Sequence, residues 1–393
     1  MTTDRIDIIY NKLEISRQDW GIIALAFVLS RVILYTIGYF GAMHYNVETD
    51  QIGQVALAKS VEQDVWNVFC QFDCAWFKTI ADIGYDTYPH GLTTGHAANW
   101  AFFPLFPILG HYIAALLGLE SLYGFYIIAN ISSFAMLPLF FLCLRQLGQN
   151  LDSARFGVWL LAFSPYTVYF IAPYTESSFL ALTMMVFLFS YRHQWFWVAV
   201  AGVIMTATRN LGVMVVFSIA IIALQTYGWR EMFRFGEKTW RVLLAIWCVP
   251  FVMFVYMFYM HLLVGDAFAF KNIQLAWGRL FDNPFEYWIE GFETGGRKIY
   301  LSIVIALGWL INIYLFKQKR VAEAVFMLIC CFIPLFTSTN AFPRYMFGLY
   351  PTSLALVLMV RNRPQLRPAL LVVSALLSSY FVIAWVNAKF FTV

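Results

Sequence analysis

The residues best suited to chemistry begin with Asp73, an acidic residue in a polar segment after the first apolar run. Around it, apolar residues recur at spacings of three and four, the pattern of one helical face, at Phe69, Phe72, Trp76, Ile80 and Ile83. Gly84 is a natural helix stop. We expect an amphipathic interfacial helix with its aromatic face in lipid and Asp73 at the water boundary. The carboxylate serves there either as a general base or only as a charge favoured by the helix dipole.

Two arginines stand in strongly apolar surroundings: Arg209 interrupts the stretch 195–227, and Arg344 lies in the last outer turn. An ionisable group at membrane depth is costly and is by default a functional candidate. A guanidinium fork suits a phosphate, so both are predicted to bind the phosphate of a lipid donor, with Lys78 as a third candidate. The alternative for the arginines is snorkelling to the interface or pairing with Glu176.

The remaining candidates are polar and aromatic residues that the predicted topology places at the same face. Glu176 opens an apolar run and either caps a helix or contacts sugar hydroxyls. The other predicted substrate-binding residues are Trp76, His96, Gln274, Trp277 and Arg279. The tryptophans can stack on a sugar ring, although a place in the interfacial aromatic belt is the first expectation for them.

The cysteines give no sign of a metal site, because no cysteine–histidine spacing resembles a zinc motif. Cys70 and Cys74 lie one helical turn apart, where the geometry for a disulfide within one helix is poor. We therefore expect free thiols. No cofactor or metal is required by the sequence, and no nucleotide motif or nucleic-acid partner is indicated.

The elements that position these residues must be membrane helices. Of 393 residues, 61% are hydrophobic and 12% are charged, and many uncharged runs approach the roughly 20 residues that cross a bilayer. We expect an all-α polytopic protein, a single domain over 1–393. Its predicted spans are 20–43, 122–144, 156–172, 176–191, 195–208, 211–227, 240–264, 298–316, 321–337, 344–360 and 368–388.

The distribution of charge predicts the orientation of these spans. Short connections rich in arginine and lysine, together with the N-terminus, belong in the cytoplasm, whereas the acidic loops 44–121 and 265–297 belong outside. The C-terminus then lies outside. The apolar segment 101–118 cannot cross fully under this rule, and Pro104 and Pro107 would break a spanning helix early. We expect 101–118 to be a juxtamembrane or re-entrant helix.

Six short motifs in this order resemble those of the GT-C class of membrane glycosyltransferases, and within it the PIG-V-type mannosyltransferases (GPI mannosyltransferase 2 and its bacterial relatives). The motifs are Phe72-Asp73-Cys74-Ala75-Trp76-Phe77, Phe102-Phe103-Pro104-Leu105-Phe106-Pro107, Pro173-Tyr174-Thr175-Glu176-Ser177, Thr208-Arg209-Asn210-Leu211-Gly212, Gly265-Asp266 through Trp277-Gly278-Arg279, and Pro343-Arg344-Tyr345 before Tyr350-Pro351. Asp73-Cys74-Ala75 departs from the Asp-Gly that is commoner in this family, which leaves the acid intact.

The resemblance implies a GT-C-like bundle and an inverting transfer of a sugar, commonly mannose, from a polyprenyl-phosphate donor. Asp73 matches the general base of the family. The acceptor is expected to be a lipid or glycan. The location is expected to be a bacterial inner membrane with the active site facing the periplasm or exterior, or the ER membrane in a eukaryote.

Two other classes compete with this interpretation. An O-antigen ligase or polymerase-like enzyme would work at the same face but would depend on arginines rather than on Asp73. A transporter or flippase of lipid-linked sugars would favour inverted repeats and unwound helices near the midplane. The sequence contains no such repeat, and its polar residues gather toward one face.

Overall fold

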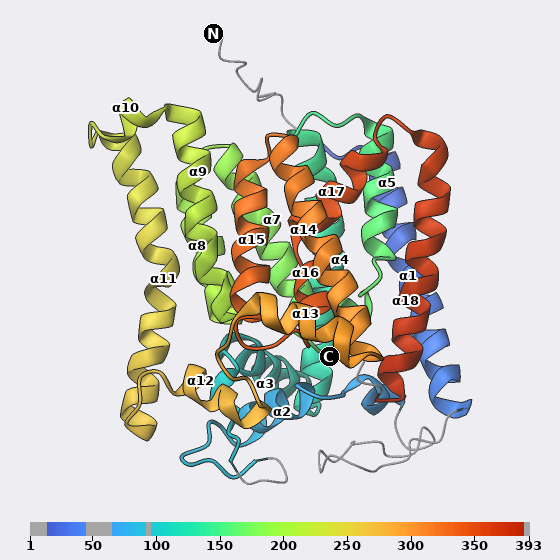
Figure 1. Cartoon of the computed structure of the whole chain (residues 1–393), viewed down its shortest axis with the longest axis vertical. Coiled ribbons are helices and arrows are strands. Elements are labelled where there is room, and N and C mark those ends of the chain that lie inside the picture. The colour runs from blue at the N-terminus through green and yellow to red at the C-terminus, as the bar shows by residue number, and fades with distance from the viewer. Residues whose placement is uncertain (1–13, 45–64, 92–95, 389–393) are drawn as a thin grey trace.

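The structure, a computed structural model, describes residues 14–44, 65–91 and 96–388, and these form a helical bundle without named strands (Figure 1). In the described part of the chain, six helices are long and apolar enough to cross a membrane. They are α1 (Arg17–His44), α4 (Ser121–Gln146), α9 (Val215–Tyr227) with the turn η3 (Asn210–Met214) before it, α11 (Glu237–Val264), α14 (Arg297–Lys317) and α18 (Arg367–Val386) after η5 (Pro364–Leu366). The predicted polytopic all-α membrane fold is confirmed.

Shorter apolar helices complete the bundle: α3 (Leu105–Leu117), α7 (Glu176–Tyr191), α8 (Trp195–Thr208), α15 (Val321–Leu335) and α17 (Tyr350–Val360). Each predicted span contains a helix, but 156–172 and 344–360 are interrupted. The first is divided into α5 (Leu151–Ala162) and α6 (Val168–Ile171), and the second into α16 (Phe342–Phe347) and α17. Proline explains both breaks, because Pro165 cannot continue α5 and Pro351 lies in the first turn of α17.

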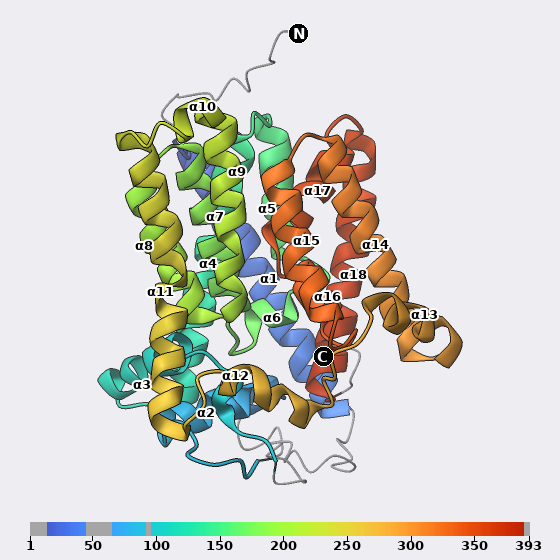
Figure 2. The same ribbon diagram turned by 60° about the vertical axis from the view of Figure 1, so that its left-hand side comes forward.

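One end of the bundle, which we call the loop end, carries short helices from both predicted outer loops (Figures 1 and 2). The first loop supplies η1 (Val65–Phe69), α2 (Cys74–Asp82), η2 (Asn99–Ala101) and α3, and the second supplies α12 (Ala269–Asn272), η4 (Ile273–Trp277) and α13 (Pro284–Thr294). The 13 residues of α3 reach about 20 Å, which is less than the roughly 30 Å of a hydrocarbon core. That 101–118 does not cross the membrane stays a prediction, because α8 and α17 are similarly short and lie in predicted spans.

The opposite end, which we call the basic end, gathers the connections rich in arginine around α10 (Trp229–Met232) and the start of α1. Arg155 of α5 donates to Asp19 of α1 at 2.7 Å, and Arg367 of α18 donates to Ser153 at 2.8 Å. These bonds place the start of α1, the α4–α5 turn and the start of α18 together. α18 begins here and ends at the loop end (Figure 1), and the assignment of the basic end to the cytoplasm stays a prediction.

Two predictions about the first outer loop are wrong. Cys70 and Cys74 form a disulfide rather than free thiols. They do not share one helix, because the chain turns between η1 and α2 and brings their Cα atoms to 5.2 Å. The predicted apolar face of the segment is also not in lipid throughout: Phe69 and Ile80 are buried in protein, and Ile83 is exposed.

The centre of the bundle is the helix α7, which is enclosed by other helices for most of its length. No residue of α7 is exposed: most are buried, and the partly buried Ser178, Leu182, Met185 and Phe189 follow one stripe of the helix. The main hydrophobic core includes the region where α7 packs with α4, α8, α9 and α17. Glu176 is the first residue of this helix, on the side of the loop end, so a buried acidic group stands where the central helix begins.

Candidate active site

Four charged residues from four distant segments meet where α7 begins, and we call them the charge network: Asp73, Glu176, Arg209 and Arg344. Arg344 Nη1 donates to Asp73 Oδ2 at 2.6 Å, and Arg344 Nε donates to Glu176 Oε1. Arg209 Nη1 donates to the same Glu176 oxygen and to Thr175 Oγ1 at 3.2 Å. One buried carboxylate therefore joins both arginines, and Arg344 extends the connection to Asp73.

Asp73 is the N-cap residue of α2, but its side chain does not cap the helix. The carboxylate turns instead toward Arg344, which lies 271 residues later in the chain. The backbone N–H of Asp73 donates to the Tyr174 hydroxyl at 2.8 Å. The interpretation of Asp73 as a simple capping charge is thus incomplete, because its side chain is committed to a long-range ion pair.

Arg209 stands at the tip of a helical hairpin. α8 ends at Thr208, Arg209 is extended with φ −152° and ψ 140°, and η3 returns the chain toward α9. Gly212 makes this turn possible, since a Cβ there would lie 2.7 Å from the backbone of Thr206. Arg209 therefore lies where the chain reverses its direction between α8 and α9.

The network is recessed within the depth of the bundle, because the helices that end at it are short. α8 has 14 residues and α7 has 16, so they reach about 21 and 24 Å, less than the roughly 30 Å of a hydrocarbon core. The 28 residues of α1 and of α11 reach much farther. Figure 2 shows α11 continuing past the end of α8 toward α2 and α12. Irregular backbone at such depth is tolerated where it is enclosed by protein.

Aromatic rings fix the two guanidinium groups in place. Arg344 Cζ lies 4.8 Å from the ring centre of Tyr169 and 5.0 Å from that of Tyr174. Arg209 Cζ lies 5.8 Å from Phe179 and 5.7 Å from Tyr345. Such contacts stabilise a cation and restrict the directions in which its N–H groups point. These rings were not among the predicted site residues, although Tyr174 lies in the motif Pro173–Ser177 and Tyr345 in the motif Pro343–Tyr345.

The members of the network differ in exposure, which separates their roles. The side chains of Glu176 and Arg344 are 4% and 8% exposed, whereas those of Arg209 and Asp73 are 15% and 23% exposed. Two positive and two negative charges balance, as burial requires. Among the described residues, Nε and Nη2 of Arg209 have no hydrogen-bond partner, so they remain available to an anion.

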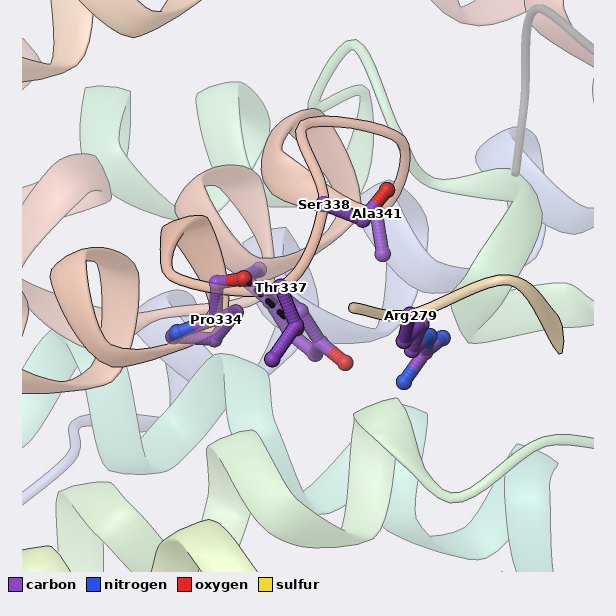
Figure 3. Close-up of a pocket in the computed structure, with 6 residues that line it drawn as sticks. Arg279, Pro334, Thr337, Ser338 and Ala341 are labelled. Atoms are coloured by element: carbon purple, nitrogen blue, oxygen red, sulfur yellow. Dashed lines mark hydrogen bonds between the residues drawn. The ribbon is translucent and has the colours of Figure 1, made fainter. Parts of the chain in front are cut away.

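A small recess adjoins the network on the side of the second outer loop. It is lined by Arg279, Pro334, Thr337, Ser338, Ala341 and Tyr345. Figure 3 shows Arg279 on a separate segment beside the turn that carries Thr337 and Ser338. Arg279 Nη1 donates to Gln274 Oε1 at 2.6 Å, so two predicted substrate-binding residues act as a pair. Tyr345 lines the recess and also contacts Arg209, which connects the recess to the network.

The aromatic candidates form a separate cluster. Trp76 stacks on Phe102 with ring centres 6.0 Å apart and meets the edge of Trp277 at 5.8 Å. Both tryptophans remain partly exposed. The structure therefore joins the first and second outer loops through these rings, as η2 and η4 also contact each other.

Lys78 and His96 are not brought into the network. Lys78 Nζ pairs with Asp82 at 3.2 Å and with Glu120 at 3.6 Å. His96 is exposed in the loop before η2. A search of the described residues finds no group of three histidine, cysteine, aspartate or glutamate side chains that could hold a metal ion.

Comparison with protein-family models and with curated proteins gives no match to this chain. Among solved structures, ArnT from Cupriavidus metallidurans bound to undecaprenyl phosphate aligns with 96% of this chain and 77% of its own, at 12% identity and a TM-score of 0.52. The fold is similar to that of ArnT. This likeness agrees with the GT-C-like bundle predicted from the sequence.

A second similarity is to the oligosaccharyltransferase AglB from Archaeoglobus fulgidus, in complex with an inhibitory peptide and a dolichol-phosphate. It has 12% identity and a TM-score of 0.44 over 95% of this chain and 56% of the archaeal one. An Archaeoglobus fulgidus oligosaccharyltransferase in complex with Zn and sulfate has 16% identity, a TM-score of 0.42 and coverage of 92% and 53%. This chain thus spans about half the length of the archaeal enzyme.

Proposed function

We propose that this protein is an inverting glycosyltransferase that moves a sugar from a polyprenyl-phosphate donor to a lipid-linked or glycan acceptor. The observation that carries the proposal is the charge network, in which a partly exposed carboxylate and an arginine with free N–H groups share one recessed site. The fold supports the donor class, because ArnT, the structure with the higher TM-score, was solved with undecaprenyl phosphate.

The proposed reaction uses Asp73 and Arg209, the two more exposed members of the network. Asp73 accepts the proton of the acceptor hydroxyl while the oxygen of that hydroxyl forms a bond to the anomeric carbon of the sugar. The bond between that carbon and the phosphate oxygen breaks, and its electron pair leaves with the lipid phosphate. Attack from the face opposite the leaving group inverts the anomeric centre.

The arginines stabilise the charge that develops on the phosphate. Arg209 has two guanidinium nitrogens free among the described residues and is proposed to contact the phosphate directly. Arg344 is bonded to both Asp73 and Glu176, so it holds the base in position and contributes positive charge nearby. Glu176 holds the two arginines at a fixed spacing, and we propose this as its main role and a contact with the sugar as its secondary role.

The outer residues are proposed to bind the rest of the substrates. Arg279 and Gln274 contact polar groups beside Tyr345, and Trp76 with Trp277 offers a ring surface to a sugar. Lys78 and His96 are retained only as contacts with headgroups at the rim. Mannose as the sugar, and the PIG-V subfamily, rest on the motif resemblance alone.

The orientation is also part of the proposal. The basic end faces the cytoplasm by the positive-inside rule, so the network faces the periplasm or exterior in a bacterial inner membrane, or the lumen of the ER in a eukaryote. The Cys70–Cys74 disulfide supports this orientation, because disulfides persist in oxidising compartments. The location of the network toward one end favours a transferase over a transporter that binds at the midplane.

The experiment is a transfer assay with purified protein and a panel of polyprenyl-phosphate sugars. We expect one donor class to give product, and Asp73→Asn to lower turnover by about two to four orders of magnitude, the usual contribution of a positioned base. Near-normal transfer by Asp73→Asn would rule out the base role and favour the ligase-like alternative.

The matched control for this experiment is Asp82→Asn on the same helix. Asp82 accepts a bond from Ser121 at 2.5 Å through one oxygen, and an asparagine oxygen can replace it. Asp86 is a poorer control, because its carboxylate accepts the backbone N–H of Asn99 at 2.9 Å and holds the loop together. We expect Asp82→Asn to keep at least half of the turnover.

A further inference from the structure

The turn that carries Asp73 is held from two sides. The Cys70–Cys74 disulfide closes a loop of five residues that contains Asp73. On the other side, the Tyr174 hydroxyl donates to the backbone oxygen of Gln71 at 2.7 Å and accepts the backbone N–H of Asp73 at 2.8 Å. Both cysteines and Tyr174 are buried, whereas the Asp73 side chain is 23% exposed, so the restraints on the turn are shielded from solvent more than the carboxylate is.

The backbone of this turn needs such restraint. Phe72 has a φ of +49°, a left-handed conformation that costs a residue with a side chain roughly 1–2 kcal/mol. The apolar spacing from residue 69 to 83 favours one continuous helix, but η1 ends at Phe69 and α2 starts only at Cys74. Local preference therefore opposes the observed turn. Straightening it into a helix would carry the Asp73 carboxylate away from Arg344.

The same tyrosine couples the turn to the rest of the network. The Tyr174 ring lies 5.0 Å from Arg344 Cζ, while its hydroxyl bonds the backbone on either side of Phe72. The position of Asp73 relative to Arg344 is thus set by one rigid side chain that contacts both. The disulfide limits the same turn from the opposite side.

We propose that the Cys70–Cys74 disulfide and the Tyr174 hydroxyl are positioning groups for Asp73, so that sugar transfer requires the oxidised form of the first outer loop. This inference rests on the proposed function, in which Asp73 is the base. A dithiol reductant would break the S–S bond, supply two electrons and two protons to form two thiols, and become a disulfide itself. Reduction then releases the turn and lowers turnover without removing any group that contacts substrate.

The first test compares Cys70→Ser/Cys74→Ser with the unchanged protein. A small misplacement of a catalytic group can lower rates by about 100-fold, and we expect turnover to fall by about 10- to 100-fold. The donor KM should change little, because Arg209 and Glu176 stay in place. Cys248→Ser is the matched control, since Cys248 is an exposed free thiol on α11, outside the turn.

Treatment with a dithiol should reproduce the effect in the unchanged protein and in Cys248→Ser. It should cause no further loss in Cys70→Ser/Cys74→Ser. If that variant does not fold, reduction of folded protein carries the test, with mass spectrometry after alkylation to verify that Cys70 and Cys74 are free. Complete reduction with unchanged turnover would overturn the proposal.

The second test separates positioning from general structural support. A group that acts through Asp73 has no effect once the base is gone, so adding the cysteine substitutions to Asp73→Asn should leave the residual rate unchanged. Equal losses in both backgrounds would show a merely structural role. Tyr174→Phe, which removes one hydroxyl, should likewise lower turnover in the parent and not in Asp73→Asn.

The two proposals fail in different ways. If Asp73→Asn retains full transfer, the assignment of the base is wrong, whatever the cysteine variants do. If Asp73→Asn loses transfer but Cys70→Ser/Cys74→Ser keeps normal turnover, the base stands and only the positioning role is excluded.

Discussion

The two ends of the bundle use arginine in different ways. At the basic end, Arg155 pairs with Asp19, a carboxylate that also accepts the neighbouring Ser16 hydroxyl and, among the described residues, pairs with no second arginine. At the loop end, Glu176 is shared by two arginines, one from the turn between α8 and η3 and one from α16. The first arrangement fastens α1 to α5. The second places two guanidinium groups around one buried carboxylate, and two neighbouring guanidinium groups suit an anionic ligand.

The difference between the two ends explains why an arginine surrounded by apolar residues in the sequence is a useful signal of a functional site. Arg155 and Arg367 lie near the starts of α5 and α18 at the basic end, where each donates to a nearby side chain or carbonyl. Arg209 and Arg344 lie where helices break inside the bundle. A cation is placed there only with compensation from a carboxylate, an aromatic ring or a ligand, and the network supplies the first two.

The largest effect on stability is expected from Glu176→Gln. The substitution removes the negative charge that Arg344 and Arg209 share. Breaking a buried ion pair of this kind costs about 3–5 kcal/mol. Thermal unfolding in detergent would measure the loss, and transfer should fall with it. A variant as stable as the unchanged protein would contradict the view that Glu176 holds the arginines together.

A smaller and more selective effect is expected from Arg209→Lys. Lysine keeps the charge but cannot reproduce the guanidinium fork, so the donor KM should rise by about tenfold, equivalent to roughly 1.4 kcal/mol of binding. Kinetics at varied donor concentration would test this, with Arg279→Lys as a comparison outside the network. An unchanged donor KM and turnover in Arg209→Ala would leave Arg209 a structural role only.

The matched change at the basic end, Arg155→Gln, should affect stability alone. The Arg155 side chain is 26% exposed, and partly exposed ion pairs contribute about 1 kcal/mol or less. We expect a small decrease in unfolding temperature and normal transfer. A loss of transfer comparable to that of the Arg209 variants would remove the distinction between the two ends.

The smallest effect is expected from Lys78→Gln. Although the sequence pattern made Lys78 a candidate for phosphate binding, its ammonium group pairs with Asp82 and Glu120, and the Lys78 and Glu120 side chains are 32% and 74% exposed. We therefore expect no measurable change in donor KM. A rise equal to that of Arg209→Lys would place the donor phosphate nearer to α2 than the network implies.

The membrane fold could be predicted because its signals are local. Apolar runs, prolines and basic connections are readable residue by residue, and each predicted span contains a helix. The breaks after Ala162 and before Tyr350 follow from nearby prolines. Which residues pack against each break depends on the tertiary structure and cannot be read from the sequence. Sequence periodicity likewise predicted the stop at Gly84, which has a φ of +102°.

The site was predictable in part. Asp73, Glu176, Arg209 and Arg344 could each be selected as unusual polar residues, and pairing with Glu176 was one alternative for the arginines. The sequence could not show that one oxygen of Glu176 serves both, nor that Arg344 reaches Asp73, because these contacts depend on tertiary packing. The disulfide was missed because a continuous helix was assumed, and the left-handed Phe72 that breaks it leaves no pattern in the sequence.

The bond from Arg344 to Asp73 has a consequence for the biogenesis of the protein. The two residues are separated by 271 positions, so the first outer loop is synthesised long before its arginine partner. During insertion, Asp73 and Glu176 are present without Arg344 until α14 and α15 have been made. The network therefore exists only after the late helices have docked, and a partly inserted chain holds the base without the group that aims it.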